Sequence, residues 1–164
     1  MSFLGLQTAS NLSFYAIPAA WVTAIAPHLY AIAVYTTEQA PGTPEFNYVH
    51  PSENVSKIKD AKLSPAAQGR FLRAESAQNN GFINIPFFAA AVLAGNFARL
   101  PASTLNTCAG AYLVSRVVYN LLYITTTDNN IAKARTLTYF AGIGACFTLL
   151  IQAGNKFANG YISL

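Results

Sequence analysis

The sequence predicts an all-α fold, an integral membrane bundle of four helices. Of its 164 residues, 53% are hydrophobic and only 10% are charged, whereas soluble domains carry about 25% charged residues. Four apolar stretches are long enough to cross a hydrocarbon core of about 30 Å, which takes roughly 20 helical residues. A β-barrel would instead need segments of about ten residues with alternating hydrophobicity. The predicted helices span residues 12–35, 65–97, 103–124 and 131–153 of one membrane domain, 1–164.

The first span, residues 12–35, is expected to stay in the mature chain, because no Lys or Arg precedes it and no small-residue cleavage site is evident. Pro18 and Pro27 each remove a backbone hydrogen bond, so we expect a bent helix whose defects the neighbouring helices cover. His28 lies inside this span. An intramembrane histidine is a functional candidate, and the simpler alternative, which we favour, is a neutral imidazole bonded to a backbone carbonyl.

Residues 36–64 form a polar loop outside the bilayer, with three prolines, four acidic residues and three lysines. Its length exceeds that of the usual connection, so it is either mobile or folded as a cap over a site. Ser64 and Pro65 then give a helix start, a capping hydroxyl followed by proline at the first helical position. The following helix crosses the membrane with its apolar half, from Ala77 onward, and Pro86 is expected to kink it.

Short polar segments bound the last two spans. A tight turn around Pro101 makes the second and third spans antiparallel neighbours, and the TTTDNN segment ends the third. Cys108 and Cys146 fall inside these spans, where a free thiol behaves as a small hydrophobic group, so we predict neither a disulfide nor a metal site. Gly142 and Gly144 are small residues that let helices approach closely.

The distribution of basic residues predicts the orientation of the chain. The long loop, the start of the second helix and the loop before the fourth hold seven Lys and Arg, whereas the opposite side holds two. Because basic loops stay in the cytosol, we expect the loop 36–64 to be cytosolic and both termini to be luminal. The basic residues form no continuous stripe, which argues against nucleic acid as a partner. The seven are Lys57, Lys59, Lys62, Arg70, Arg73, Lys133 and Arg135, and the two are Arg99 and Lys156.

Three of the helices carry a polar stripe in their cytosolic halves. Residues separated by four or seven positions share one face of a helix, because each residue turns about 100°. Arg116 lies inside an apolar helix, where insertion costs at least about 2.5 to 3.5 kcal/mol, so it should face a protein cavity or an anionic partner. The stripes are Arg73, Asn80 and Asn84; Tyr112, Arg116, Tyr119 and Tyr123; and Arg135 with Tyr139.

Together, the three stripes suit a multiply anionic ligand that is peptide-like or carries phosphate. The alternative is that single arginines extend to lipid headgroups or pair with acids such as Glu75 or Asp128. Both explanations stay open for Arg73 and Arg135, which lie near helix ends. The second is weaker for Arg116, because no acid lies near it on its own helix.

Three segments resemble the membrane-associated proteins of eicosanoid and glutathione metabolism, which include microsomal glutathione transferases and the related leukotriene and prostaglandin synthases. RAESAQNNGFINIPFF (73–88) is similar to the family's second helix, RVVYNLLYI (116–124) to its third-helix Arg and Tyr motif, and ARTLTY (134–139) to the start of its fourth helix. With the span count and loop lengths, the resemblance covers residues 12–153. It implies a homotrimer in the endoplasmic reticulum membrane that binds glutathione between subunits and acts on small lipophilic substrates.

The resemblance also implies the residues of a glutathione site. Arg135 matches the arginine that holds the thiolate and is the catalytic candidate, because a nearby guanidinium favours the thiolate, which is the nucleophile. The matching cofactor-binding positions are Arg73, Asn80, Arg116, Tyr119, Tyr123, Thr136 and Tyr139.

Two positions depart from the family pattern. Ser76 stands where a second arginine is usual, and Ile83 stands where a glutamate would bind the amino group of glutathione. Asn84 lies within about 40° of Asn80 on the same helix and is the cofactor-binding candidate that can partly substitute. Loss of one charge-assisted hydrogen bond, worth about 1.5 to 3 kcal/mol, weakens binding about ten- to a hundredfold.

Three functions are compatible with these features. The favoured one is a membrane-bound glutathione transferase or peroxidase that acts on lipophilic electrophiles. The second is a glutathione-independent isomerase or cyclase that uses the same cavity, with Glu75, His28 or a tyrosine as acid or base. The third is a non-catalytic membrane scaffold in which the polar stripes hold subunits together.

Overall fold

The computed structural model describes residues 10–161 of the chain, leaving the side chains of Asn130 and Tyr161 aside. Every regular element in that range is helical, which confirms the predicted all-α fold class. The elements, in chain order, are the 3₁₀ turn η1 (Ser13–Tyr15), α1 (Ala16–Thr37), α2 (Pro51–Ser56), α3 (Pro65–Phe97), α4 (Ala102–Thr125) and α5 (Asn129–Tyr161).

The four long helices lie where the apolar stretches of the sequence lie. α3 begins and ends at the residues expected of it, because the Ser64 hydroxyl accepts a hydrogen bond from the Ala67 N–H and so caps the first turn. α5 differs, since it continues to Tyr161 rather than ending at 153. Polar residues end an apolar run without ending a helix, so the apolar run of the sequence is shorter than the helix.

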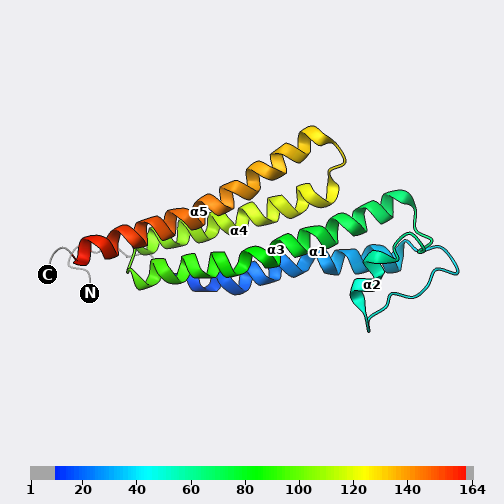
Figure 1. Cartoon of the computed structure of the whole chain (residues 1–164), viewed down its shortest axis with the longest axis horizontal. Coiled ribbons are helices and arrows are strands. Elements are labelled where there is room, and N and C mark those ends of the chain that lie inside the picture. The colour runs from blue at the N-terminus through cyan, green and yellow to red at the C-terminus, as the bar shows by residue number, and fades with distance from the viewer. Residues whose placement is uncertain (1–9, 162–164) are drawn as a thin grey trace.

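Three of the described helices are long and apolar enough to cross a membrane: Ser13–Thr37, Pro65–Phe97 and Ile131–Gly160. α4, which carries Arg116 inside its apolar run, is not among these three. It packs lengthwise against the other long helices within the same bundle (Figure 1). The chain is therefore an integral membrane protein.

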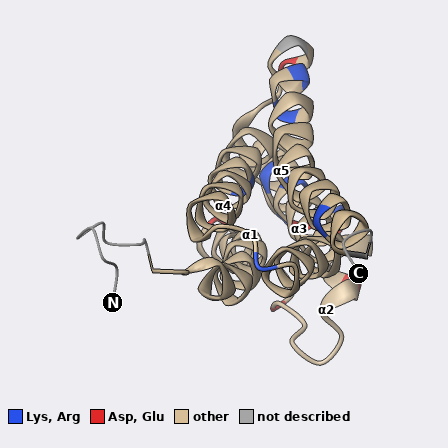
Figure 2. Cartoon of the chain, turned by 90° about the vertical axis from the view of Figure 1, so that its left-hand side faces the viewer, with Lys and Arg blue, Asp and Glu red and all other residues tan. Residues whose placement is uncertain are grey.

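The four long helices form two pairs. α1 packs mainly against α3, and α4 packs mainly against α5 (Figure 1). Viewed end on, the α4 and α5 pair lies over the α1 and α3 pair (Figure 2). Contacts of α3 with both α4 and α5 join the two pairs. This arrangement brings the striped helices α4 and α5 together beside the third striped helix, α3.

Small and aromatic residues fix the spacing of the helices. A methyl group built on Gly81 would lie 2.8 Å from the Ala24 Cβ atom, so α1 and α3 touch closely at this point. The rings of Phe88 and Tyr112 stack with 3.9 Å between their centroids and join α3 to α4. Both rings are fully buried. The half of the bundle nearer the termini is therefore a packed apolar core.

The prolines differ in their effect on the helices. Pro18 lies in the first turn of α1, where the backbone N–H groups have no partner within the helix. The hydrogen bond expected to be lost at Pro18 is therefore not lost, because α1 begins at Ala16. α1 continues through Pro27, and α3 continues through Pro86.

The long loop is folded as a cap at one end of α1 and α3. Phe46 and Leu63 from the loop are buried in a cluster with Tyr35 of α1 and Phe71 of α3. The Tyr35 hydroxyl donates to the Pro44 carbonyl oxygen over 3.0 Å. The loop is therefore folded against the ends of α1 and α3, and its role as a cover over a site stays a prediction.

The short helix α2 is held by Asn54. This buried side chain accepts a hydrogen bond from the Asn47 N–H over 2.9 Å and donates to the Asn47 carbonyl oxygen over 3.0 Å. On the exposed side of α2, Lys57 Nζ lies 2.8 Å from Glu53 Oε2. This hydrogen-bonded pair lowers the pKa of the Glu53 carboxyl and raises the pKa of the Lys57 amine.

Candidate functional site

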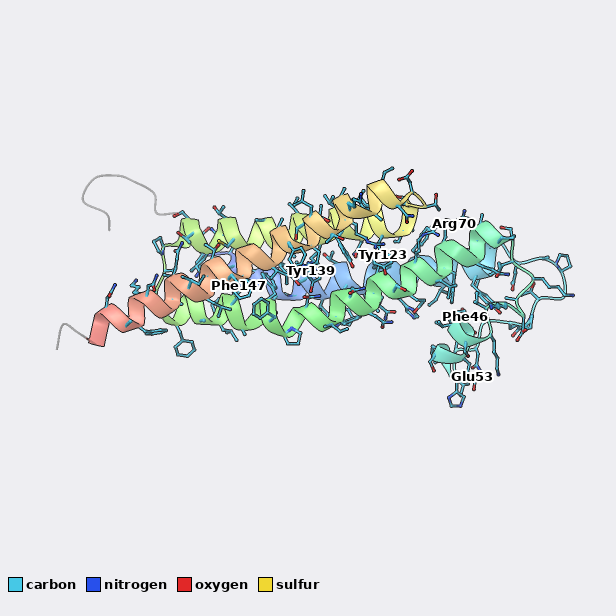
Figure 3. The ribbon with its side chains drawn as sticks, turned by 45° about the horizontal axis from the view of Figure 1, so that its top comes forward. Phe46, Glu53, Arg70, Tyr123, Tyr139 and Phe147 are labelled. Carbon is cyan, nitrogen blue, oxygen red and sulfur yellow. The ribbon has the colours of Figure 1, made fainter. Side chains whose placement is uncertain are left out.

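The polar stripe of α4 faces the start of α5, and the two helices form a cluster of arginine and tyrosine side chains. Consecutive members from α4 are three or four residues apart, so they lie on one face of the helix. Tyr123 and Tyr139 are labelled in Figure 3, which shows them beside the α4 and α5 seam. The arginine–tyrosine cluster consists of Tyr112, Arg116, Tyr119 and Tyr123 of α4 with Arg135 and Tyr139 of α5.

Arg116 is the inner member of the cluster, with only 4% of its surface exposed. Its guanidinium carbon lies 5.0, 5.6 and 4.7 Å from the ring centroids of Tyr112, Tyr119 and Tyr139. Its Nη2 atom donates to the Tyr139 carbonyl oxygen over 3.2 Å. A cation over an aromatic face is stabilised by about 0.5 to 2 kcal/mol. Aromatic faces thus take the place of lipid around this charge.

Arg135 is the outer, half-buried member of the cluster. Its guanidinium carbon lies 4.1 Å from the Tyr123 ring centroid. The Tyr123 ring is 5.5 Å from Tyr119, and the Tyr119 ring is 5.9 Å from Tyr139. A continuous row of rings therefore links the accessible arginine to the enclosed Arg116.

Asn84 joins α3 to the cluster. The Tyr139 hydroxyl donates to Asn84 Oδ1 over 3.1 Å, and Asn84 Nδ2 donates to the Asn80 carbonyl oxygen. The Asn80 side chain in turn donates to the Ser76 carbonyl oxygen over 2.9 Å. Because Asn84 is buried and both ends of its amide are engaged, it is not open to a ligand in this arrangement. It positions Tyr139 instead.

Arg73 and Thr136 lie at the margin of the cluster. Arg73 Nε donates to the Ile124 carbonyl oxygen over 2.8 Å, next in sequence to Tyr123, so Arg73 lies at the same end of the bundle as Arg135. Thr136 is exposed, and its hydroxyl lies 3.5 Å from the Ala132 carbonyl oxygen of its own helix. The predicted residues therefore form one connected group, except Thr136, which points to the outer surface.

The two departures from the family pattern lie on the outer face of α3. Ile83 is 75% exposed, and the Ser76 hydroxyl donates to the Leu72 carbonyl oxygen over 2.9 Å. Exposed Asn79 lies between them, since the three positions fall within one narrow sector of the helix. A ligand or partner that contacts position 83 therefore approaches from outside this protomer.

His28 and Glu75 form a pair that sequence reasoning missed. His28 Nδ1 lies 2.8 Å from Glu75 Oε1, and the two side chains are 21% and 13% exposed. The prediction that the His28 imidazole bonds to a backbone carbonyl is therefore wrong. Glu75 pairs with His28 rather than with Arg73. These residues are 47 positions apart, so no helical spacing relates them. Only the antiparallel register of α1 and α3 brings them together.

A groove of about 480 Å³ runs between α1 and α4. Its walls are almost wholly apolar and include Val22, Pro27, Val117, Leu121 and Ile124. Its polar lining residues include Asn120, whose Nδ2 atom donates to the Thr23 carbonyl oxygen over 2.9 Å. A groove of this size and composition suits a lipophilic molecule.

Gly142 and Gly144, which the sequence pairs as small residues, have different roles. A Cβ atom on Gly142 would lie 2.3 Å from Ser115 Oγ and 3.0 Å from Arg116 Nη2. A Cβ atom on Gly144 would have no atom within 4 Å. Gly142 alone lets α5 approach the buried arginine.

The cysteines take no part in the cluster. Cys108 is half-buried and Cys146 is buried, and both are free thiols. Across residues 10–161, no group of three His, Cys, Asp or Glu side chains has the arrangement of a metal site.

Comparison with known proteins places these features in a family context. The chain matches the family model of the MAPEG family over residues 14–155, which includes every member of the arginine–tyrosine cluster. No curated protein and no solved structure matches the chain.

Proposed function

Because this chain belongs to the MAPEG family, we propose that it is a membrane-bound glutathione transferase or peroxidase that acts on lipophilic electrophiles. The family's membrane proteins include glutathione transferases, peroxidases and eicosanoid synthases. One observation carries the proposal: Arg135 is held against Tyr123 with its guanidinium half-buried and reachable from outside the protomer.

The proposed role of Arg135 is to stabilise the glutathione thiolate. A free thiol has a pKa of about 8.5, and a guanidinium beside it favours the ionised form. The thiolate then attacks the electrophilic centre of the substrate. Stacking on Tyr123 restricts the Arg135 side chain before the ligand arrives, so less conformational entropy is lost on binding.

The remaining residues divide into ligand-facing and supporting groups. Arg73 and Tyr123 are half-buried at the open end of the cluster, and we assign them to the carboxylates and backbone of glutathione, with Asn80 and Thr136 as its outer contacts. Tyr119 is buried behind Tyr123 and supports that ring. Arg116 adds positive charge from behind the rings of the tyrosines. Asn84 holds the Tyr139 hydroxyl, so its contribution is to orient that tyrosine rather than to bind the ligand.

The amino group of glutathione has a poorer partner here than in the family pattern. Position 83 is isoleucine, and the neighbouring Asn84 amide is engaged within the protomer. Glutathione binding is therefore expected to be weaker by about ten- to a hundredfold than with a carboxylate at position 83. The groove between α1 and α4 is the proposed place for the lipophilic substrate.

We also propose a homotrimer in the endoplasmic reticulum membrane, with the loop 36–64 in the cytosol. Exposed Asn79 supports self-association, because an amide facing hydrocarbon lacks hydrogen-bond partners that a second copy can supply. We propose three copies, rather than another number, because the family resemblance implies a trimer. Native mass spectrometry of the detergent complex measures the copy number, and a monomer would contradict this proposal.

Calorimetry on the detergent-solubilised protein tests the glutathione site. We expect saturable heat at millimolar glutathione and an ultraviolet difference spectrum of bound thiolate at neutral pH. S-methylglutathione, which cannot ionise at sulfur, is expected to bind without the thiolate spectrum. Absence of heat at millimolar ligand would overturn the proposal.

The pair of His28 and Glu75 favours one second candidate, a thiol-independent isomerase. Glu75 can orient the imidazole, whose Nε2 atom is then the base that moves a proton on a lipophilic substrate. Because His28 lies nine residues before the end of α1, the pair is about 13 Å from that end, measured along the helix axis. It lies on the flank of α3 away from Asn84, so this activity would use its own site rather than the arginine–tyrosine cluster.

A lipophilic β,γ-unsaturated ketosteroid tests this second candidate, because its isomerisation needs only proton transfer. Thiol-independent formation of the conjugated enone, lost in Glu75→Gln and retained in the matched loop variant Glu53→Gln, is the expected result. Equal rates for Glu75→Gln and the unchanged protein would reject a catalytic role for the pair.

A further inference from the structure

Two neighbouring apolar side chains project outward from the long loop. Tyr48 and Val49 are 68% and 80% exposed, although the same loop buries Phe46 and Leu63 in its contact with the bundle. They belong to the loop tip, residues 46–57, which contains the short helix α2. Exposed apolar residues that lie together on a fixed support mark an interaction surface. The kind of partner depends on where the loop tip lies relative to the membrane spans.

A row of aromatic rings fixes the level of the loop tip along the bundle. The Tyr48 ring centroid lies 4.9 Å from that of Phe46, which lies 5.4 Å from that of Tyr35 in α1. Tyr35 is two residues before Thr37, the end of α1, and so about 3 Å from that end along the helix axis. It belongs to one of the membrane-spanning helices. The loop tip is therefore held beside the last turn of a membrane span, which is the level of the bilayer interface.

The loop tip lies at the flank of the bundle. α2 lies beside the α1 and α3 pair, on the side of the bundle opposite α4 and α5 (Figures 1 and 2). Phe46 and Glu53, which are labelled in Figure 3, lie on this side. α1 itself exposes Leu29 by 60% one to two turns before the level of Tyr35. The loop tip therefore borders the apolar outer surface of a membrane helix.

The loop tip also turns polar groups inward. Asn47 Oδ1 accepts hydrogen bonds from the N–H groups of Val49 and His50, over 3.0 and 2.9 Å. Buried Asn54 accepts from the Asn47 N–H and donates to the carbonyl oxygens of Asn47 and Pro51. These internal hydrogen bonds replace bonds to water, and a backbone polar group without a partner is costly near lipid. The combination of inward polar groups and outward apolar side chains suits a region poor in water.

We propose that the loop tip is an interfacial membrane anchor, and that its partner is the phospholipid bilayer around the bundle. Tyr48 and Val49 enter the boundary between headgroups and acyl chains. Tyrosine is enriched at this boundary, because its ring is apolar and its hydroxyl is polar. The anchor holds the loop against the membrane beside α1, on the side of the bundle away from the arginine–tyrosine cluster.

Apolar contact rather than charge holds this anchor. The charged residues of the loop tip are Glu53 and Lys57, which pair with each other at 2.8 Å, so the loop tip has no net charge to attract anionic lipid. The anchor is separate from the proposed thiol chemistry, because it shares no residue with the arginine–tyrosine cluster. Failure of one proposal therefore leaves the other standing.

Fluorescence quenching of the full-length protein in lipid nanodiscs tests the anchor. Trp21 is the single tryptophan of the chain, so Tyr48→Trp in a Trp21→Phe background reports on the loop tip alone. We expect quenching by a phospholipid brominated near the carboxyl end of its acyl chains, and protection from aqueous iodide. Val49→Trp in the same background is an independent reporter and should give the same result.

Ala40→Trp in the Trp21→Phe background is the matched control. Ala40 is exposed in the same loop, and its N–H donates to the Lys62 carbonyl oxygen, so it lies past the end of α1 and before the start of α3. This variant should be quenched by iodide and much less by the brominated lipid.

Quenching of both tip reporters by iodide and not by lipid would overturn the proposal, because it would place the loop tip in solvent. Quenching by neither would also overturn it, because protein such as a second copy would then cover the loop tip. Val49→Asp in the Tyr48→Trp variant should weaken lipid quenching and increase iodide quenching, whereas Val49→Leu should change neither. The result should be the same in phosphatidylcholine with and without phosphatidylserine, and a requirement for phosphatidylserine would reject an anchor held by apolar contact.

Discussion

Replacing Arg135 with glutamine is expected to lower the rate of glutathione conjugation about a hundredfold at neutral pH, since loss of one donor to a developing or resident anion typically has an effect of this size. The guanidinium favours the thiolate, so its removal raises the pKa of the bound thiol towards its free value of about 8.5. The loss should therefore be largest at low pH and shrink as pH rises through that value. Conjugation of 1-chloro-2,4-dinitrobenzene, followed by absorbance across a pH series, measures both effects.

Lys133→Gln is the matched control for this prediction. It removes the same charge two residues earlier, from an exposed position near the start of α5. We expect a rate close to that of the unchanged protein and an unaltered pH profile. An equal loss in both variants would mean that general positive charge near the headgroups, rather than contact with the thiolate, explains the effect.

Replacing Gly142 with alanine is expected to destabilise the protein, because the new Cβ atom would lie 2.3 Å from Ser115 Oγ and 3.0 Å from Arg116 Nη2. Overpacking of this kind costs about 1 to 3 kcal/mol, which corresponds to a fall in Tm of about 5 °C for a chain of this length. Displacement of α5 should also lengthen the 3.2 Å hydrogen bond from Arg116 to the Tyr139 carbonyl oxygen. Thermal unfolding in detergent measures the change.

Two further variants make this prediction specific to the contact. Gly144→Ala, on the same helix, meets no atom within 4 Å and should raise Tm slightly, because alanine favours a helix over glycine by about 1 kcal/mol. Ser115→Ala in the Gly142→Ala background removes the nearest clashing atom and should restore part of the lost stability. A loss in Gly144→Ala equal to that in Gly142→Ala would assign the effect to helix flexibility instead.

The candidate site could be predicted from the sequence only as separate stripes. Helical spacing places Arg116, Tyr119 and Tyr123 on one face of α4, because the period of a helix is fixed by its backbone hydrogen bonds. Helical spacing does not show which of the three polar stripes contact one another. That Arg116 reaches the Tyr139 carbonyl oxygen, and that Asn84 is engaged by the Tyr139 hydroxyl, depends on how α3, α4 and α5 are set against one another.

The same limit explains the two features that the sequence missed. His28 and Glu75 meet because α1 and α3 run antiparallel in one register, which side-chain packing fixes over the whole seam. Gly142 and Gly144 are alike in sequence, yet only the first faces α4. Whether a small residue is needed depends on what lies opposite it.

The sequence by itself determined the all-α class, the membrane location and the approximate extent of the long helices, because apolar length and helical period are local properties of the chain. It also predicted which side chains share a helix face. Only the tertiary structure decided that Arg116 is enclosed by tyrosines, that Asn84 is already occupied and that the long loop folds as a cap. These depend on contacts between residues distant in the chain, whose energies exist only once the helices are packed.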